Sequence, residues 1–579
     1  MVTLQRRTGN DDLELPAKIP PLLQRIYRQR NIQKAEELNL GLGNLLGPDS
    51  MRGLDAAVNL LVTALQQQQR ILFVADFDAD GATSCALGLS ALAQMGASHV
   101  DYIVPNRFDY GYGLTPEIVE LAIQKEPDLI ITVDNGISSI EGVTCAQQAG
   151  IKVLVTDHHL APAQLPDADA IVNPNQPGCD FPSKSIAGVG VIFYVLSALR
   201  AKLRADNWFV EQGLSEPNMA GYLDLVALGT VADVVPLDRN NQILVDEGLR
   251  RIRAGQSRPG ITALLRVAKR DSRQLNSTDL GFGLGPRLNA AGRLDDMSTG
   301  IECLLAGDDG TAYQYALQLD GMNRDRRQIE KEMADQAFAA LRELHLDADS
   351  LPPAICVYDS RWHQGVVGIL ASRIKENFNR PVIAFANASD ADDAELKGSA
   401  RSIKGFHIRD VLDAIATKNP GLISKFGGHA MAAGLSLQKD KLDEFERGFQ
   451  AEAALHLTAA QLQAVVESDG PVAVDDFNLE TAQSVRFGGP WGQEFPEPLF
   501  DDRFLVREQR RVGENHLKMT LSPMNNQQYL VDAIAFNVDE TDWPAADCQE
   551  MHLAFRLDIN EFRGQRSVQL LVDHIIEVV

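Results

Sequence analysis

The feature that most constrains the fold is a set of three apolar runs that each end in acidic or imidazole residues. The runs lie at 71–75, 129–133 and 153–156. A continuous run rich in β-branched residues, with no polar alternation, is typical of a strand buried on both faces of a parallel sheet. Ligands bind beyond the carboxyl ends of such strands. One edge of one sheet is therefore expected to carry Asp76, Asp78, Asp80, Asp134, Asp157, His158 and His159.

Carboxylates gathered at one sheet edge repel one another unless cations lie between them. Asp76, Asp78 and Asp80 alternate as a strand enters a turn, so their carboxylates can point to one side. For a single aspartate, a turn that caps the following helix is the better interpretation. For three, with two more acidic strand ends nearby, a metal site is favoured. Asp134-Asn135-Gly136 alone is more often a turn, and it gains weight only from its neighbours.

The triplet Asp157-His158-His159 strengthens the prediction of a metal site. Two adjacent side chains beyond a strand cannot both face one way. One histidine is expected to bind a metal, and the other to orient a carboxylate or act on substrate. A lone histidine would be better explained as a hydrogen-bonded core residue, but the acidic neighbours favour a metal here. The sequence thus predicts a site with more than one divalent ion.

Length and composition indicate a cytoplasmic protein of several domains. The chain has 579 residues, too many for a single core. Its six cysteines are scattered, without a CxxC pair, as expected for reduced thiols. No segment approaches the length of a membrane span, and the first residues lack the apolar core of a signal peptide. We therefore expect no membrane association.

The net charge of −25 limits the surface that can bind nucleic acid. Phosphate contacts need Lys and Arg, so such a surface must be locally basic. Five short β-like runs near the end of the chain predict a small barrel or sandwich, and cations gather there. A merely solvated barrel face is the alternative. The cations are Arg503, Arg507, Arg510, Arg511, Lys518, Arg563 and Arg566.

Patterns along the chain predict an α/β protein in five parts. Strand-like and helix-like segments alternate after residue 69, which predicts βαβ units and a parallel sheet covered by helices. A long helix, a second and smaller α/β region and the β-rich region follow. The predicted parts are a helical lead-in at 1–68, a catalytic domain at 69–310, a connecting helix at 311–350, a substrate-binding domain at 351–456 and a nucleic-acid-binding β domain at 457–579.

Six motifs occur in order along the chain. They are Asp-Phe-Asp-Ala-Asp-Gly at 76–81, Val-Asp-Asn-Gly-Ile-Ser-Ser at 133–139, Thr-Asp-His-His at 156–159, Gly-Thr-Val-Ala-Asp-Val-Val-Pro at 229–236, Leu-Gly-Pro-Arg-Leu-Asn-Ala-Ala-Gly-Arg at 284–293 and Gly-Gly-His-Ala-Met-Ala-Ala-Gly at 427–434. Together these motifs resemble the DHH phosphoesterase superfamily. Within it, the chain is similar to the bacterial exonucleases that degrade single-stranded DNA in the 5′→3′ direction. The resemblance implies a parallel-sheet DHH domain, a long connecting helix, a DHHA1-like α/β domain and an OB-fold barrel.

The resemblance also implies which residues carry the chemistry. The expected metal ligands, with Asp76 in or beside the site, are Asp76, Asp78, Asp80, Asp134, His158 and Asp233. His159 joins the last five of these as a catalytic residue. By itself, the segment Val231–Val235 predicts a core strand that contains an acid. A buried carboxylate without a partner is costly, and the resemblance supplies a metal ion as that partner.

Substrate contacts are implied in further segments. The loop 106–113 interleaves aromatic residues, a cation and glycines, which suits base stacking but is also typical of a loop packed on itself. The turn at 427–429 suits either phosphate binding through backbone amides or a tight turn before a helix at 430–434. An extended run at 398–402 suits one phosphate, with a solvated arginine as the alternative. The expected residues are Arg107, Tyr112, Arg287, Asn289, Ser399, Arg401, Gly428 and His429.

The predicted activity is metal-dependent hydrolysis of single-stranded DNA to 5′-mononucleotides, in recombination and repair. Two ions stabilise both the attacking and the leaving oxygen in such sites. Mixed Asp and His ligation suits Mn²⁺, with Mg²⁺ as the other candidate. A cleft between the first two domains is expected to hold the strand. The resemblance alone implies the 5′→3′ polarity, and it implies single-stranded-DNA-binding protein and a DNA helicase as partners of a monomeric enzyme.

Two other functions are compatible with the motifs. The first is a DHH-family phosphodiesterase that acts on short oligonucleotides, cyclic dinucleotides or pyrophosphate. The predicted barrel argues against it, because small substrates need no such platform. The second is a non-catalytic scaffold, which would be expected to have lost metal ligands, and this chain retains all of them.

Overall fold

The computed structural model describes residues 3–105, 113–343, 351–388, 394–513, 515–536, 538 and 548–578. The chain forms two compact units. The larger comprises residues 6–323 and 468–579, and the smaller comprises residues 1–5 and 324–467. The C-terminal β region therefore shares a unit with the parallel sheet, and the second α/β region is inserted between them in the sequence. None of the described helices combines the length and the apolar character that crossing a bilayer requires.

The larger unit contains a five-stranded sheet in which every pair of neighbours is parallel. Its order is β3-β2-β4-β5-β6. All residues of β2 and β4 are buried, so the predicted two-sided burial of these runs is confirmed. The strands are β2 (Ile71–Ala75), β3 (Val100–Ile103), β4 (Leu129–Val133), β5 (Lys152–Thr156) and β6 (Ala170–Val172).

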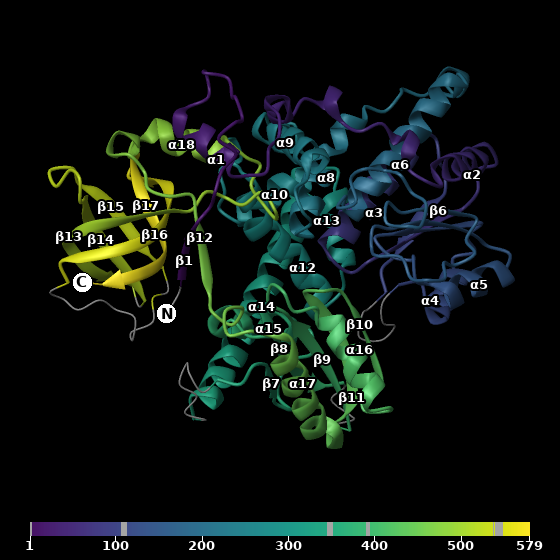
Figure 1. Ribbon diagram of the computed structural model, residues 1–579. Coiled ribbons are helices and arrows are strands. Elements are labelled where there is room, and N and C mark those ends of the chain that lie inside the picture. The colour runs from purple at the N-terminus through teal and green to yellow at the C-terminus, as the bar shows by residue number, and fades with distance from the viewer. Residues whose placement is uncertain are drawn as a thin grey trace. The chain divides into compact units, whose positions relative to one another are not determined.

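Helices cover both faces of this sheet (Figure 1). Because successive strand residues point to opposite faces, Ile71 and Phe73 pack into one core while Leu72 and Val74 pack into another. The first core is shared with α2 (Leu54–Gln66), α3 (Ala79–Gln94) and α6 (Gly188–Ala205). The second is shared with α4 (Pro116–Ile123) and α5 (Ile140–Gln148).

In the helical segment after α6, one predicted strand is wrong. The segment Val231–Val235, expected as a strand, instead spans the end of α8 (Leu223–Ala232), and Asp233 is the C-cap residue of this helix. Residues 223–230 are all buried, and a helix that is apolar all round has no period that separates it from a buried strand. The remaining helices of this unit include α1 (Pro21–Arg28), α9 (Arg239–Arg253), α10 (Pro259–Val267), α12 (Gly285–Leu294), α13 (Ser298–Leu305) and α18 (Leu479–Phe487).

The C-terminal strands close into a five-stranded barrel of order β13-β14-β15-β17-β16. Phe500, Phe504 and Phe555 fill its interior together with Phe477, which precedes α18. Only the β15–β17 pair is parallel among the pairings described. The predicted OB-type barrel is confirmed. Its strands are β13 (Phe500–Val512), β14 (His516–Pro523), β15 (Val531–Ala535), β16 (Glu550–Phe562) and β17 (Gln565–Val578).

The smaller unit holds a mixed sheet of order β10-β11-β9-β8-β7, as predicted for a second α/β domain. The strands are β7 (Ile355–Tyr358), β8 (Val382–Asn387), β9 (Glu395–Arg401), β10 (Lys425–Gly428) and β11 (Ala432–Gln438). The helix expected at 430–434 is wrong, because these small residues enter β11, where Ala433 pairs with Ala400 of β9. Burial alternates along β11, and cross-strand packing outweighs the low strand propensity of Ala and Gly.

A single helix of 35 residues, α14 (Asp309–Glu343), lies in the sequence between the parallel-sheet region and the second α/β region, as predicted for the connecting helix. In the smaller unit, Met333 and Ala337 are buried on one stripe with Arg326 and Glu330. Arg326 donates to Glu330, and so does Arg373 of α15 (Val367–Phe378). The other helices of the smaller unit are α16 (Ile408–Lys418) and α17 (Leu442–His456).

Candidate metal centre

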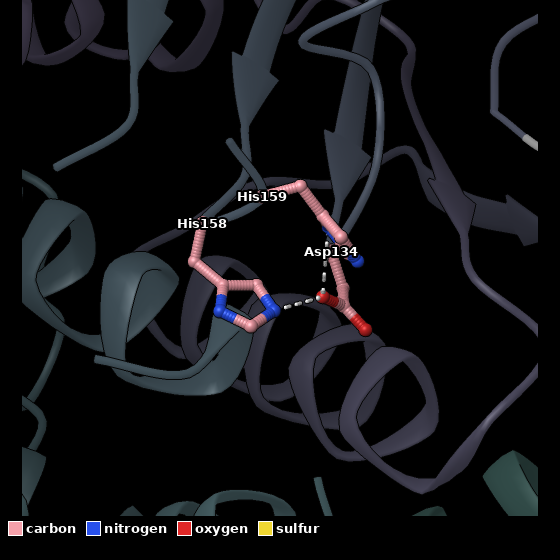
Figure 2. Close-up of side chains that lie close together, drawn as sticks. All are labelled: Asp134, His158 and His159. Carbon is pink, nitrogen blue, oxygen red and sulfur yellow. Dashed lines mark ion pairs between the residues drawn. The ribbon is translucent and has the colours of Figure 1, made fainter. Parts of the chain in front are cut away.

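Asp134, His158 and His159 converge at the carboxyl ends of β4 and β5 (Figure 2). The His158 Nε2 atom lies 3.0 Å from Asp134 Oδ1, and the His159 Nδ1 atom lies 3.9 Å from the same oxygen. The backbone of Asp134 has a φ of 62°, in the left-handed region. Both histidines thus face one carboxylate, although they are adjacent in the sequence. The prediction that the two side chains could not both face one way is therefore wrong, because the turn after β5 brings both rings to Asp134.

The first motif supplies its carboxylates from the start of α3. Asp78 is the N-cap residue, and its Oδ1 accepts hydrogen bonds from the amides of Asp80 and Gly81. Asp80 is fully buried in the first turn, where its two oxygens accept from the amides of Gly188 (2.7 Å) and Val189 (2.9 Å) at the start of α6. Asp76 follows β2 directly and is also buried. Helix capping and clustering of acids therefore occur together.

Asp233 completes the cluster from the end of α8. Its Oδ2 lies 3.5 Å from the Nε2 of His158, which is also 4.0 Å from Asp80 Oδ2. Among the described residues, three groups could each hold a metal ion, because the ligand atoms within each group lie within 4.8 Å of one another. These groups are Asp134 with His158 and His159, Asp80 with His158 and Asp233, and Asp76 with Asp78 and Asp134. Because Asp134 and His158 each belong to two groups, neighbouring ions would share ligands.

The charge balance of the cluster fits divalent cations. Burial, together with the neighbouring carboxylates, raises the pKa values of Asp80 and Asp134 well above their ordinary range. Burial and the nearby Asp78 raise the pKa of Asp233 to about 7. Each shift reports a carboxylate whose negative charge is not compensated by the protein alone. The donor set of carboxylate oxygens and imidazole nitrogens suits Mn²⁺ and Mg²⁺, so the residues present fit such ions.

Asp157 has a different role from the other acids, and this role was not predicted from the sequence. Its Oδ1 accepts hydrogen bonds from the amides of His158 and His159 and lies 2.7 Å from His159 Nδ1. Burial opposes ionisation of Asp157, but these contacts lower its pKa to about 2. Burial likewise opposes the charge on His159, yet the bond to Asp157 raises the pKa of this imidazole to about 9. His159 is therefore held as a cation beside the cluster.

Two asparagines that the sequence analysis missed fix the backbone of the histidine pair. Asn173 donates to the carbonyl of His159 (2.9 Å), and Asn175 donates to the carbonyl of His158 (2.6 Å). Both follow β6, the next strand of the sheet. The Asn-Pro-Asn sequence after a short apolar run was the available signal, because it places two amide side chains at the same sheet edge.

Arg287 and Asn289, expected to contact substrate, make contacts within the protein. The Arg287 Nε atom donates to Asp320 of α14 (3.0 Å), and the arginine is mostly buried. Asn289 accepts a hydrogen bond from the amide of Ala79 (2.7 Å). Asn289 thus caps α3 beside Asp78. Both residues lie on α12, which holds the first motif in position.

The remaining predicted substrate residues lie in the smaller unit or outside the described residues. Arg401 donates to the hydroxyls of Ser399 (3.1 Å) and Ser372 (3.2 Å), so Ser399 and Arg401 share one side of β9 as predicted. Gly428 has a φ of 138° in the hairpin between β10 and β11, and the amide of His429, an exposed residue, donates to the carbonyl of Ala432. Arg107 and Tyr112 lie in the segment 106–112, outside the described residues.

Some of the cations expected to form a basic barrel face are paired with acids. Arg503 donates to Glu550 and to Glu577, and Lys518 lies 3.3 Å from Asp532. These pairs cancel part of the positive charge that the sequence placed on the barrel.

Comparisons with known proteins agree with the fold. Three family models match the chain: "DHH family, N-terminal domain" at residues 70–230, "DHHA1 domain" at 352–454 and "RecJ OB domain" at 468–574. The single-stranded-DNA-specific exonuclease RecJ of Dickeya dadantii is 55% identical over 575 residues, which is 99% of each chain.

Solved structures of RecJ from Thermus thermophilus resemble the whole chain. The complex with Mn²⁺ matches with a TM-score of 0.79 at 29% identity and covers 100% of this chain and 80% of that one. The complex with Mg²⁺ matches with a TM-score of 0.74 at 27% identity and covers 100% and 78%. The chain therefore belongs to the RecJ family of single-stranded-DNA-specific exonucleases.

Proposed function

We propose that the protein is a metal-dependent exonuclease that degrades single-stranded DNA in the 5′→3′ direction and releases 5′-mononucleotides. The observation that carries this proposal is the set of three overlapping groups of ligand atoms at the end of the parallel sheet. The names of the relatives support the substrate, and the Mn²⁺ and Mg²⁺ complexes support the ions. The predicted polarity rests on the resemblance alone.

Two divalent ions, Mn²⁺ or Mg²⁺, would be held by Asp76, Asp78, Asp80, Asp134, His158 and Asp233. Such a pair of ions activates water and stabilises charge on the attacking and leaving oxygens of a phosphodiester. Two of the groups, Asp80 with His158 and Asp233 and Asp76 with Asp78 and Asp134, together contain all six of these ligands. The amides of Gly188 and Val189 each donate to one oxygen of the Asp80 carboxylate. These two hydrogen bonds fix the orientation of the carboxylate, and each oxygen keeps a further lone pair for an ion.

His159 contributes through its proton and its charge. With a pKa of about 9, it is protonated at neutral pH, and its Nδ1–H is donated to Asp157. The second ring nitrogen then also carries a proton. We propose that this N–H donates to an oxygen of the scissile phosphate, where negative charge increases as the nucleophile attacks. Asp157 is a positioning residue in this scheme.

Phosphate groups farther along the strand are proposed to bind the smaller unit. Arg401 and Ser399 lie side by side on β9, and the hairpin of Gly428 and His429 exposes backbone near an imidazole. The proposal also assigns Arg107, Tyr112, Arg287 and Asn289 to the substrate. For Arg287 and Asn289, the hydrogen bonds to Asp320 and Ala79 favour a role in positioning the first motif.

The test is digestion of long single-stranded DNA labelled at either end, with Mn²⁺ and with Mg²⁺. We expect labelled mononucleotide to appear first from the 5′ label and only at the end of digestion from the 3′ label. Asp134→Asn should abolish release. Asp101→Asn should not alter it, because Asp101 is an exposed residue of β3 in the same sheet and pairs with Lys125. Early release from the 3′ label would contradict the polarity, and unchanged release by Asp134→Asn would contradict the ligand assignment.

The same assay separates this function from its main alternative. A phosphodiesterase of dinucleotides would hydrolyse dinucleotides or cyclic dinucleotides faster than the long strand. The closed C-terminal barrel favours the long strand, because a small substrate does not need a second binding surface. We further propose a monomeric cytoplasmic enzyme of recombination and repair, recruited by single-stranded-DNA-binding protein and a helicase. Pull-down with these two proteins tests that recruitment.

A further inference from the structure

Phe282 presents a large aromatic side chain to solvent near the metal centre. It is 73% exposed, whereas Leu280 and Leu284 on either side of it are fully buried. The three residues belong to a π-helical turn, Leu280–Leu284. Phenylalanine is usually buried, and π-helical turns occur often at functional sites. The buried leucines anchor the turn, so Phe282 is held outward rather than left loose.

This turn is packed against the end of α8, where Asp233 lies. A Cβ atom added at Gly281 would lie 3.3 Å from Val231 Cγ1, and one added at Gly285 would lie 3.1 Å from Ala232 Cβ. Asp233 is the next residue of the chain, and Val234 after it is 64% exposed with a φ of 64°. Phe282 and Val234 therefore stand on adjoining backbone segments beside the predicted ligand Asp233.

The surroundings of Phe282 suit a nucleotide, which has a flat base and a charged phosphate. Glycines precede and follow it, so neither neighbour in the sequence has a side chain to cover the ring. Arg270 packs against the next residue, Gly283: its Cγ lies 3.7 Å and its Nε 3.8 Å from the position of a Cβ added there. Arg270 also lies 3.4 Å from Asp279, and about half of its side chain is exposed. An exposed ring, with an arginine side chain against the next residue of the turn, matches a nucleobase with its adjoining phosphate.

We infer that Phe282 is a positioning residue that stacks on an unpaired base of the strand next to the metal centre, with Arg270 beside the phosphate. The inference rests on the proposed function and adds a reason for the preference for single strands. A base in a duplex already has both faces stacked, so it offers no face to this ring. An unpaired base does, and stacking on Phe282 orients the strand as it approaches Asp233.

The experiment compares the wild-type protein with Phe282→Leu and Phe282→Trp on single-stranded DNA. One substrate is intact, and a series carries a single abasic site at successive positions from the 5′ end. In the wild type, an abasic site at one position should raise KM by roughly 5- to 100-fold, with little change in kcat. Phe282→Leu should show the raised KM on intact DNA and no further penalty from the abasic site. Phe282→Trp should restore the wild-type pattern.

Phe487→Leu is the matched control, because Phe487 is another partly exposed phenylalanine whose ring is already covered by the Arg253 guanidinium. It should leave the abasic penalty unchanged. If Phe282→Leu keeps the wild-type KM and the wild-type abasic penalty, the inference is wrong and the exonuclease assignment stands. If the wild type releases no nucleotide from either substrate, the proposed function itself is wrong. Thermal melting of each variant verifies that it is folded.

Discussion

At the scale of single residues, Asp134 adopts a backbone conformation that non-glycine residues rarely adopt. Its φ of 62° is a left-handed conformation, which costs an ordinary residue roughly 1–2 kcal/mol and costs Asp and Asn less. The surrounding structure maintains it, since Gly188 leaves room for its side chain and Thr156 accepts its amide hydrogen. Strain of this kind persists only where the neighbours determine the conformation. Asparagine is therefore the substitution that removes the charge with the least change of backbone.

The Asp157–His159 pair gives a prediction about pH. The raised pKa of His159 means that its stabilising effect is complete below pH 6.5 and is lost as the pH rises through about 9. The lowered pKa of Asp157 means that its effect is complete above pH 3.8 and is lost as the pH falls through about 2. In Asp157→Asn, the His159 pKa should therefore fall towards 6.5. Imidazole NMR titration of the metal-free protein measures it.

Activity should follow the same substitution. At pH 8, His159 is charged in the wild type and would be mostly neutral in Asp157→Asn, so kcat should fall by about 10- to 100-fold, as for other partners that orient a catalytic histidine. The loss should shrink as the pH is lowered towards 6, where the variant imidazole is protonated again. A loss that does not change between pH 6 and pH 8 would indicate that Asp157 acts only by holding the loop.

At the same scale, the sequence predicts which residues meet at the site better than it predicts the contacts that each of them makes. The strand-end acids and histidines meet as expected, because parallel strands end at one edge of a sheet. Asp157, Asn173 and Arg287 were harder to interpret, since their roles depend on partners that are distant in the sequence or on hydrogen bonds to backbone. Arg287, for example, pairs with Asp320 of α14. No local pattern predicts that contact.

At the scale of elements, the start of α6 is a precise constraint on the metal centre. Its first amides hold Asp80, and an added Cβ at Gly188 would lie 2.8 Å from both Cβ and Oδ1 of Asp134. That approach is closer than side-chain carbons come to one another, so either the helix or Asp134 must move. The helix terminus and the strand end thus fit together only with glycine at this position.

Gly188→Ala is therefore expected to lower kcat by about 100-fold, because a displacement of about 1 Å at a catalytic group has an effect of that size. Steady-state kinetics on single-stranded DNA and calorimetric titration with Mn²⁺ measure the effect on rate and on ion binding. Gly221→Ala is the matched control, since a Cβ there would meet no atom within 4 Å. Equal rates for the two variants would show that Asp134 adjusts without loss.

The elements also show where sequence patterns are ambiguous. The sequence pattern of Val231–Val235 predicts a strand, because α8 is buried on almost all sides and its apolar residues show no helical period. The small residues of 430–434 predict a helix in isolation, because Ala has the highest helix propensity and both Ala and Gly are depleted in strands. In both places tertiary packing decides the structure, whereas the three apolar runs at 71–75, 129–133 and 153–156 form strands as predicted.

At the scale of the whole molecule, a buried ion pair links the N-terminal segment to the segment before the barrel. Arg30 makes two hydrogen bonds to Asp469, at 2.6 and 2.9 Å, and both side chains are almost completely buried. Arg30 also donates to the carbonyl of Pro496. Residues almost 440 positions apart in the sequence are thus joined within the larger unit.

Removal of one partner of this pair should be costly. Asp469→Asn is expected to lower the free energy of unfolding of the larger unit by about 3–5 kcal/mol, because the Arg30 charge stays buried without its counter-ion. Urea unfolding followed by tryptophan fluorescence reports it, since Trp491 lies against Arg30. Adding Arg30→Met should recover part of the loss. Glu216→Gln, which removes an exposed pair with Arg204, should have no measurable effect.

The fold class and the family were predictable at this scale, since the order of the motifs and the alternation of strands and helices are properties of the sequence. The grouping of the barrel with the parallel-sheet region was not, because it depends on contacts such as that of Arg30 with Asp469.

The insertion of one unit into the other has a practical consequence for experiments on motion. The chain passes between the units near residues 5, 323 and 467, and the short strand β1 (Thr3–Arg6) starts in the smaller unit while β17 ends in the larger. Fluorophores placed at Thr3 and Glu577 would therefore report on separate bodies, although both positions lie near chain ends. Energy transfer between them, recorded on single molecules with and without a bound oligonucleotide, would follow how the distance between the two units responds to substrate.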